Sequence, residues 1–344
     1  MAQEGRKRTR FVLLSVALIL ILAVVFFVEF GYLLFLRNPE SMTVEKLGFR
    51  VTDEKHKEKV FRVGQSFLTG FNTMLRHKDL DEVTAECEQF PPFYKPFCYE
   101  GSAMGFPLKA LLSFQYREDD FEQVTSRVNK NYVYLYYCGL GFWYGVRYNN
   151  NVANIEKHIR HLHPVYRYLC YDGFGFKLGF DDYVDNHAVI DKCLECQGYG
   201  KHACFQGLGR SLWFVYMDAP DRIFKLIGEL EEAYRGDCYA GLGLAVAFTN
   251  TDDLDFPFDF ALRLDDHYRI PYYQGLTWAF VARSMNDSLY FSEQMKSLTE
   301  ERRQRILQSI AACDQCFEQV DTYKAWRECT MDRIREESIF GPDM

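Results

Sequence analysis

Glycine recurs along this 344-residue chain at a nearly constant interval. The recurring positions, which share similar flanking residues, are Gly101, Gly139, Gly173, Gly207, Gly241 and Gly275. The first step between them is 38 residues long, and each of the next four is 34 residues long. A period of this length is typical of helical-hairpin repeats, in which each unit buries its apolar face against the next. The repeat therefore restricts the fold more than any other feature of the sequence.

The repeat glycines lie inside apolar segments rather than at their ends. Residues 204–209 read Cys-Phe-Gln-Gly-Leu-Gly, and residues 238–243 read Cys-Tyr-Ala-Gly-Leu-Gly. A glycine in a helix interior costs about 1 kcal/mol relative to alanine. Its recurrence at one position predicts that two helices approach each other there too closely for a larger side chain.

A polar turn follows the repeat glycine in four of the units. Its marker residues are Asn150, Asp218, Asp252 and Asn286. The run Asp218-Ala219-Pro220 predicts a helix start, with the Asp218 side chain as the N-cap and proline in the first turn. Each unit therefore reads as two helices joined by a polar turn.

The predicted fold class is all-α. We expect an α-hairpin repeat solenoid similar to TPR and Sel1-like repeats, with six units in residues 81–291. An amphipathic segment within residues 45–80 predicts an N-terminal cap helix. The highly charged residues 292–344 predict a helical C-terminal cap, as solenoids require at their ends.

The N-terminal region contains an apolar segment, residues 11–36, in which Glu29 is the single charged residue. At about 1.5 Å per residue in a helix, this length spans a bilayer. Four basic residues between Arg6 and Arg10 precede it, so the positive-inside rule predicts a cytoplasmic tail at residues 1–10. A cleaved signal peptide is the alternative, but its apolar region is shorter and ends in small residues. We expect a single-pass anchor, with the lipid bilayer as a partner of residues 11–36.

The chain contains 11 cysteines. In an oxidising compartment outside the cytoplasm, most of them should be paired. Cys87 with Cys98 would close a local loop, and Cys316 with Cys329 would join the terminal helices. The disulfide candidates are Cys87, Cys98, Cys193, Cys196, Cys313, Cys316 and Cys329.

Two CxxC pairs occur, Cys193/Cys196 and Cys313/Cys316. Together they could hold zinc, but 116 residues separate the pairs and no His-x3-5-His accompanies them. We therefore interpret these cysteines as members of local structural disulfides.

Charge and motif content exclude several classes of function. A net charge of −8, with a pI near 5.6, argues against nucleic acid as the partner. The sequence contains no Walker A loop, dinucleotide fingerprint, nucleophile elbow or HExxH helix, so we assign no catalytic residue and expect no cofactor. The histidines at 158, 161 and 163 and the acidic residues at 252–259 are the metal-binding alternatives. We interpret both clusters as solvated surface and predict no metal site.

Several segments resemble an uncharacterised bacterial family, domain of unknown function 1702, which is found beside enediyne polyketide genes. The matching segments lie within residues 45–285 and include 64–71, 99–106, 172–176, 206–215 and 241–245. The resemblance implies no established activity. It implies a gene neighbourhood of membrane proteins similar to vitamin-K-dependent carboxylases and of secreted β-propeller-like proteins. With the anchor, it predicts the bacterial inner membrane and a periplasmic C-terminal domain.

The residue just before the repeat glycine is polar in four units. These residues are Glu100, Asp172, Gln206 and Gln274, and Arg210 lies one helical turn beyond Gln206. Equivalent positions of a solenoid line up along one surface, so the five residues predict a polar stripe. The stripe is either a binding groove for a ligand or partner, or a set of hydrogen bonds between repeats in which Arg210 pairs with Asp172 or Glu100.

Two functional hypotheses follow. The first is a membrane-anchored, periplasm-facing scaffold or accessory subunit that binds other subunits of a membrane protein complex. The second is an enzyme, or an enzyme accessory, that acts on a lipid-like or polyketide-like product. An enclosed apolar cavity on which Glu100, Asp172 and Arg210 converge would favour the second hypothesis.

Overall fold

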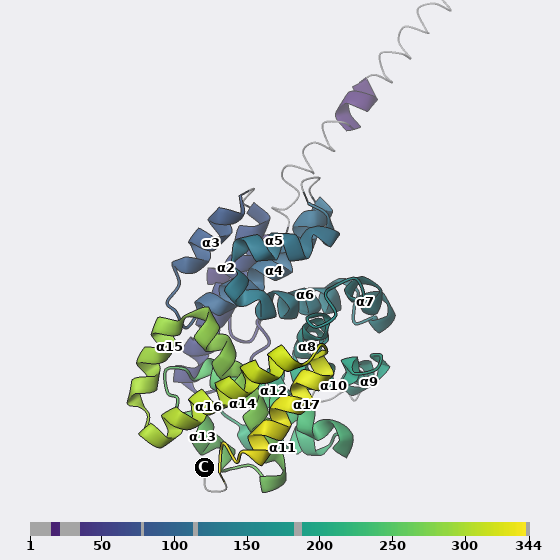
Figure 1. Cartoon of the computed structure of the whole chain (residues 1–344). Coiled ribbons are helices and arrows are strands. Elements are labelled where there is room, and N and C mark those ends of the chain that lie inside the picture. Colours follow the sequence, from purple (N-terminus) through teal and green to yellow (C-terminus); the bar gives the residue numbers. More distant parts are fainter. Residues whose placement is uncertain (1–14, 21–34, 77–78, 113–115, 182–187, 342–344) are drawn as a thin grey trace, which may run out of the picture.

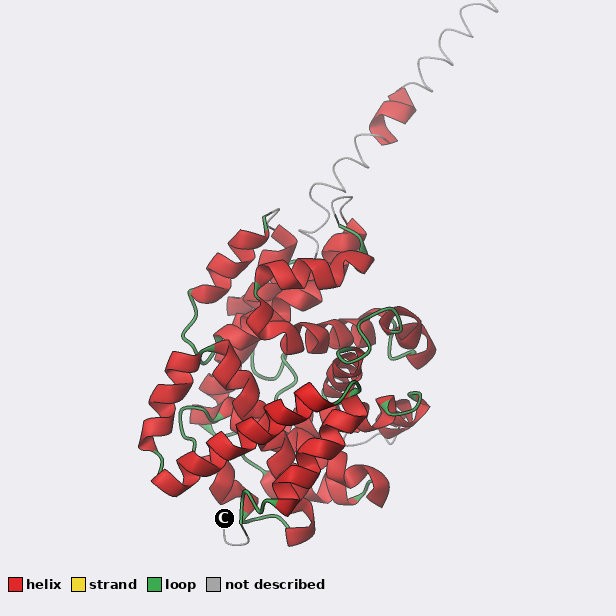
Figure 2. Ribbon diagram, in the orientation of Figure 1, coloured by secondary structure: helices red, strands yellow, loops and turns green. Residues whose placement is uncertain are grey.

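A computed structural model describes residues 15–20, 35–76, 79–112, 116–181 and 188–341 of the chain (Figure 1). Within these ranges the regular secondary structure is entirely helical (Figure 2). The predicted all-α fold class is therefore confirmed.

Long and short helices alternate along most of the chain. The long helices are α2 (Glu54–Arg76), α4 (Lys95–Leu112), α6 (Val133–Arg147), α8 (Arg167–Leu178), α10 (Gly200–Tyr216), α12 (Glu232–Thr249) and α14 (Asp266–Asn286). Each long helix packs against the next long helix in the chain. The long helices from α4 to α12 have a long helix on each side, and most of their residues are buried.

Shorter helices connect the long ones. They are α3 (Leu80–Glu88), α5 (Phe121–Val128), α7 (Val152–Ile159), α9 (Ala188–Glu195), α11 (Pro220–Gly228), α13 (Phe256–Ala261) and α15 (Ser288–Gln294). Single 3-10 turns occur at η2 (Pro39–Ser41), η3 (Glu118–Asp120), η4 (Lys130–Tyr132) and η6 (Met295–Ser297). Two further helices, α16 (Glu300–Gln319) and α17 (Tyr323–Glu336), form a C-terminal hairpin that packs on α14.

The repeat glycines lie where successive long helices touch. A Cβ atom on Gly207 of α10 would lie 1.8 Å from the Asp172 carbonyl oxygen of α8, and one on Gly241 would lie 1.8 Å from the Gln206 carbonyl oxygen. No side chain fits at these distances, so the predicted close approach of helices is confirmed here. The second glycine of the motif faces the other way: a Cβ on Gly209 would lie 2.0 Å from the Cys238 carbonyl oxygen of α12. The two glycines of a motif thus allow close contact with the preceding and the following long helix.

Helix α2 makes the same kind of contact. A Cβ on Gly70 would lie 1.8 Å from the Cys98 carbonyl oxygen, and one on Gly101 would lie 1.9 Å from the Phe67 carbonyl oxygen. The amphipathic helix predicted within residues 45–80 is therefore present. It packs on α4 as the later long helices pack on one another.

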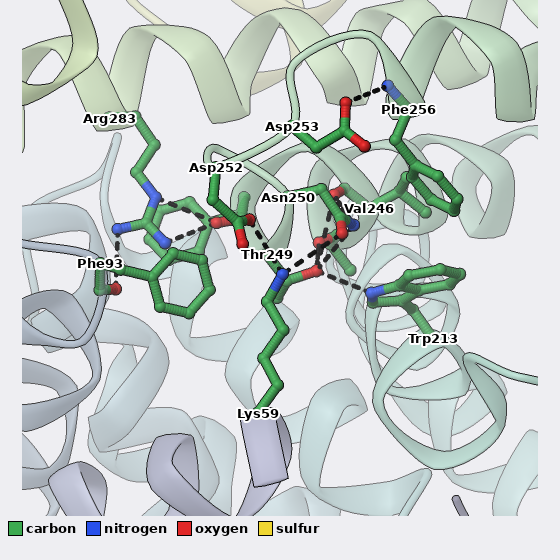
Figure 3. Close-up of polar contacts among 12 residues, drawn as sticks. Lys59, Phe93, Trp213, Val246, Thr249, Asn250, Asp252, Asp253, Phe256 and Arg283 are labelled. Carbon is green, nitrogen blue, oxygen red and sulfur yellow. Dashed lines mark hydrogen bonds and ion pairs between the residues drawn. The ribbon is translucent and has the colours of Figure 1, made fainter. Parts of the chain in front are cut away.

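The end of α14 returns to the first helices (Figure 3). Arg283 of α14 donates to the carbonyl oxygen of Phe93 at 3.1 Å, just before α4. Lys59 of α2 reaches Asp252 at 3.0 Å, in the turn after α12. These contacts join segments separated by about 190 residues, as the numbering of each pair shows. We call this region, where the last long helices meet the first, the seam.

The prediction that the Asp218 side chain caps helix α11 is wrong. Helix α11 begins at Pro220, as expected, but no side chain caps it. The Asp218 carboxylate instead accepts hydrogen bonds from the Thr52 amide at 2.6 Å, the Thr52 hydroxyl at 2.7 Å and the Asp53 amide at 3.0 Å. The Asp218 carboxylate therefore binds the segment before α2 and not the first backbone amides of α11.

No helix within the described residues is long and apolar enough to cross a membrane. The anchor predicted at residues 11–36 lies mostly outside the described ranges. It stays a prediction.

Three disulfides join helices within the described chain. Cys87–Cys98 and Cys316–Cys329 confirm the two predicted pairs. The third disulfide is Cys193–Cys204, which joins α9 to α10.

The prediction that Cys196 and Cys313 are paired is wrong, because both are free and buried. Each shares a CxxC motif with a cysteine that bonds instead to the neighbouring helix. Cys204 was missed, although it lies three residues before its repeat glycine, as Cys98 does before Gly101.

Candidate functional site

The positions before the repeat glycines form a row across the long helices. A Cβ on Gly173 would meet the Cys138 carbonyl oxygen at 1.9 Å, and one on Gly207 would meet the Asp172 carbonyl oxygen at 1.8 Å. The glycine contacts therefore bring successive members of the row together.

Four of the five predicted stripe residues meet in one buried group with two further side chains. We call this group the polar cluster; its members are Glu100, Tyr134, Cys138, Asp172, Gln206 and Arg210. Its centre is Asp172, which is fully buried. The Asp172 carboxylate lies 2.9 Å from Nη2 of Arg210 and accepts a hydrogen bond from Nε2 of Gln206 at 2.8 Å. The Cys138 thiol contacts the same carboxylate at 3.6 Å.

Arg210 connects the remaining members of the polar cluster. Its Nη2 atom lies 3.9 Å from Oε1 of Glu100, and its Nη1 atom donates to the Tyr134 hydroxyl at 3.2 Å. The guanidinium lies 4.3 Å from the ring centroid of Phe176, in cation–π contact. Within the described residues, Nε of Arg210 is buried without a hydrogen-bond partner, and the Glu100 carboxyl group accepts no hydrogen bond. The cluster thus contains unused hydrogen-bonding capacity.

Burial controls the protonation of the two acids. It raises the pKa of Glu100 to about 7; the Arg210 charge opposes this shift and the Asp172 charge adds to it. Burial also raises the pKa of Asp172, against the opposing charge of Arg210 and the Gln206 hydrogen bond. Although burial disfavours the charged guanidinium, Asp172 holds the pKa of Arg210 well above its usual range. Arg210 and Asp172 therefore form the lasting ion pair, and Glu100 is the member that titrates near neutral pH.

The polar cluster borders an apolar cavity of about 270 Å³. Glu100, Tyr134 and Arg210 contribute to its wall. The rest of the wall is mostly aromatic and aliphatic, and includes Phe67, Phe142, Phe176, Phe180, Phe214 and Phe248. Apart from Phe180, which follows α8, these residues come from α2 and from five further long helices, and the segment before α2 also contributes to the wall of the cavity. We call it the first cavity.

Gln274, the fifth predicted stripe residue, lies apart from the polar cluster. Its side chain donates to the Arg327 carbonyl oxygen of α17. The intervening position of the row is Ala240, whose methyl group offers no hydrogen bond. The row of polar contacts therefore stops at Gln206.

The two alternative metal clusters are engaged in other contacts. The His158 ring lies 2.7 Å from the Tyr148 hydroxyl. Arg302 binds the carboxylates of Asp255 and Asp259. Across the ranges that the structure describes, no group of three or more His, Cys, Asp or Glu side chains is placed to hold a metal ion.

Sequence reasoning missed three residues of this region. Cys138 occupies the row position before Gly139, so the repeat register could have found it. Tyr134 lies elsewhere on its helix, and no motif marks it. Tyr323 comes from the C-terminal hairpin and donates to Oε1 of Gln206 at 3.4 Å. No repeat connects Tyr323 to that position.

The fold and the site define an all-helical domain with a buried polar cluster beside an apolar cavity. The family model described as Protein of unknown function (DUF1702) matches residues 29–337, so the chain belongs to this family. This confirms the resemblance noted in the sequence. Searches of curated proteins and of solved structures find no match.

Proposed function

We propose that the folded domain binds a largely apolar small molecule in the first cavity. The molecule presents one uncharged hydrogen-bonding group to Glu100 and Arg210. A single observation carries this proposal: two ionisable side chains, only 5% and 4% exposed, form part of the wall of an otherwise mostly apolar cavity. Ligand sites commonly combine apolar walls with a few convergent polar groups.

The charges of the polar cluster favour an uncharged ligand group. Asp172 already neutralises Arg210, so an anionic group would face the uncompensated Glu100 carboxylate. A cationic group would lose its hydration in the apolar cavity, and among the described residues its one carboxylate neighbour there would be Glu100, because Asp172 is paired with Arg210. A carbonyl or hydroxyl group meets neither penalty, and it can bond to the protonated Glu100 carboxyl group. This class includes lipid-like and polyketide-like molecules.

Glu100 also supports the catalytic form of this proposal. A carboxyl group whose pKa is near 7 can both accept and donate a proton at neutral pH. In an enzyme acting on such a ligand, Glu100 would be the acid–base residue. Because of the cavity, we favour the hypothesis of an enzyme or enzyme accessory over the scaffold hypothesis, which the sequence alone favours.

We further propose that the long and short helices are TPR- or Sel1-like hairpin units of a solenoid whose ends meet at the seam. The repeated glycine contacts support this architecture. Residues 11–36 would anchor the chain in the bacterial inner membrane, with the helical domain in the periplasm. The three disulfides support an oxidising compartment. In this setting the protein acts as an accessory subunit beside membrane-protein partners.

Probe binding tests the proposed function. The full chain, purified in mild detergent and transferred to amphipol, is titrated with the neutral fluorophore N-phenyl-1-naphthylamine. Decanol, decanoate and decylamine then compete for the site, and we expect decanol to displace the probe best. Ala245→Phe fills the first cavity from a wall position and should weaken probe binding at least tenfold. Equal binding by a folded Ala245→Phe variant, checked by circular dichroism, would refute the proposal.

A further inference from the structure

A second apolar cavity, of about 310 Å³, lies beneath the C-terminal hairpin. Its wall includes Trp278 and Ala282 of α14, Cys313 of α16, and Tyr323 and Trp326 of α17. Two members of the polar cluster also line it, Gln206 of α10 and Tyr134 of α6. The proposed function makes no use of this space.

The two cavities share a wall. Tyr134 of α6 and Leu244 of α12 line both of them. Arg210 lines the first cavity and Gln206, one helical turn away on α10, lines the second. The polar cluster therefore lies between two apolar spaces.

Tyr134 is the larger of the two dividing side chains. Its hydroxyl accepts one hydrogen bond, from Nη1 of Arg210 at 3.2 Å. A single hydrogen bond of this kind contributes little net stability, because water replaces it when it breaks. The Tyr134 side chain is only partly buried, and it lines both cavities. A change of side-chain rotamer at Tyr134 is thus an inexpensive way to join the two cavities.

We propose that the two cavities form one binding lumen divided by Tyr134, and that the lumen takes an unbranched, chain-like ligand whose uncharged polar group lies at the polar cluster. This inference rests on the proposed function and deepens it. The first cavity, of about 270 Å³, is below the roughly 300–1,000 Å³ typical of ligand sites and the second, of about 310 Å³, is at its lower end, whereas the joined lumen falls well within that range. A chain that extends from the polar cluster into both spaces uses both apolar walls. The polar cluster holds the polar group of the ligand and so sets the position of the chain along the lumen.

A chain-length series tests the shared lumen. Linear 1-alkanols from hexanol to hexadecanol compete with N-phenyl-1-naphthylamine on the full chain in amphipol. In the wild type, affinity should rise roughly fourfold per added methylene and continue to rise for the longest chains. Ala282→Phe, which fills the second cavity from its wall, should lower hexadecanol affinity more than tenfold and hexanol affinity less than twofold.

Identical chain-length profiles in the wild type and in a folded Ala282→Phe variant would overturn the shared lumen and leave the proposed function standing. Failure of every alkanol to displace the probe from the wild type would overturn both. Tyr134→Ala, which removes the divider, should raise hexadecanol affinity, and Tyr134→Phe, which keeps the ring, should not raise it as much. If hexadecanol bound Tyr134→Ala only as tightly as it binds the wild type, Tyr134 would not divide the lumen, and the proposal would be overturned.

A measurement on the unmodified chain is independent of variant folding. Cys313 is a free cysteine in the wall of the second cavity. Hexadecanol should slow its alkylation by N-ethylmaleimide at least fivefold, as read by peptide mass spectrometry, whereas hexanol should not. Cys170, which lines neither cavity, is the internal reference. Equal alkylation of Cys313 with both alcohols would overturn the proposal.

Discussion

Arg210 and Arg283 are both buried, yet their surroundings differ. Arg210, in the polar cluster, lies 2.9 Å from the Asp172 carboxylate. Arg283, at the seam, has no carboxylate at ion-pair distance among the described residues; it donates to the carbonyl oxygens of Phe93 and Phe248 (Figure 3). Its guanidinium lies 3.8 Å from the Phe248 ring centroid. Burial accordingly lowers the pKa of Arg283 to about 10, whereas Asp172 keeps that of Arg210 well above its usual range.

The difference follows from how each contact arises. Asp172 and Gln206 occupy equivalent positions of successive units, so one repeated glycine contact brings them together with Arg210. The partners of Arg283 are main-chain carbonyl groups, which every residue possesses. One of them lies 190 residues away. A repeat in the sequence can therefore predict that Arg210 meets Asp172, but it cannot predict that Arg283 reaches Phe93.

The largest effect is expected where the repeat itself is broken. In Gly207→Ala the new methyl carbon would lie 1.8 Å from the Asp172 carbonyl oxygen, and neither backbone can yield without separating α8 from α10. We expect at least 4 kcal/mol of destabilisation, or no folded protein. Chemical denaturation followed by circular dichroism measures it.

The matched control is Gly228→Ala. This exposed glycine lies at the end of α11, and a Cβ there would meet nothing within 4 Å. The substitution should stabilise the fold by up to about 1 kcal/mol, because alanine has the higher helix propensity. Similar losses at both positions would contradict the close-approach interpretation.

Arg210→Met should have the next largest effect. It leaves the Asp172 carboxylate fully buried, with only Gln206 and Cys138 as hydrogen-bond donors. Removing one partner of a buried ion pair typically costs about 3–5 kcal/mol. The double variant Arg210→Met/Asp172→Leu should recover part of this loss, as urea denaturation would report. No recovery would show that Arg210 stabilises the fold by packing alone.

The repeat register explains what the sequence could predict. The glycine spacing predicted the alternating helices and the close helix contacts, and it narrowed the partner of Arg210 to Asp172 or Glu100. The same register marks Cys204 as a disulfide cysteine, since Cys98 and Cys204 occupy equivalent positions and each forms a disulfide with a cysteine of the preceding short helix. Cys170 and Cys238 share that register too, but the position opposite each is an isoleucine, Ile159 or Ile227. These units therefore carry a free thiol.

Other features depend on contacts that no local pattern encodes. Asp218 matches a helix cap, but its carboxylate binds the segment before α2, because three hydrogen-bond donors from Thr52 and Asp53 converge on it. Tyr134 and Tyr323 reach the polar cluster from positions outside the register. The cavities arise from how large aromatic side chains fill the space between helices, which depends on all of them together.

A third prediction concerns the pH dependence of stability. The pKa of Glu100 is about 7 in the folded protein and near its ordinary value of 4.5 when unfolded. The folded state therefore binds more protons in this window, and the free energy of unfolding falls as pH rises from 4.5 through 7. The fall should be on the order of 1–3 kcal/mol. Urea titrations at a series of pH values measure it.

Glu100→Gln is the control, because it keeps the shape of the side chain and removes the titrating proton. The charged neighbours Arg210 and Asp172 remain as a pair, and burial keeps the Cys138 thiol neutral by raising its pKa. In this variant the fall between pH 5 and 8 should disappear, and stability at pH 8 should exceed that of the wild type. An unchanged pH profile would assign the dependence to another group.

The smallest effect is expected at the seam. Arg283→Met leaves the Phe93 and Phe248 carbonyl groups without their donor, at about 1–3 kcal/mol for each buried group. The variant also no longer buries an unpaired charge, which offsets part of this cost. We expect a net loss of about 2 kcal/mol, below that of Arg210→Met. Amide hydrogen exchange should accelerate at the start of α4 and the end of α12, while the centre of α10 keeps its protection. If exchange instead accelerated evenly along the chain, the seam and the other long helices would unfold as one cooperative unit. The two arginines would then differ in their partners and pKa but would not stabilise separate regions of the fold.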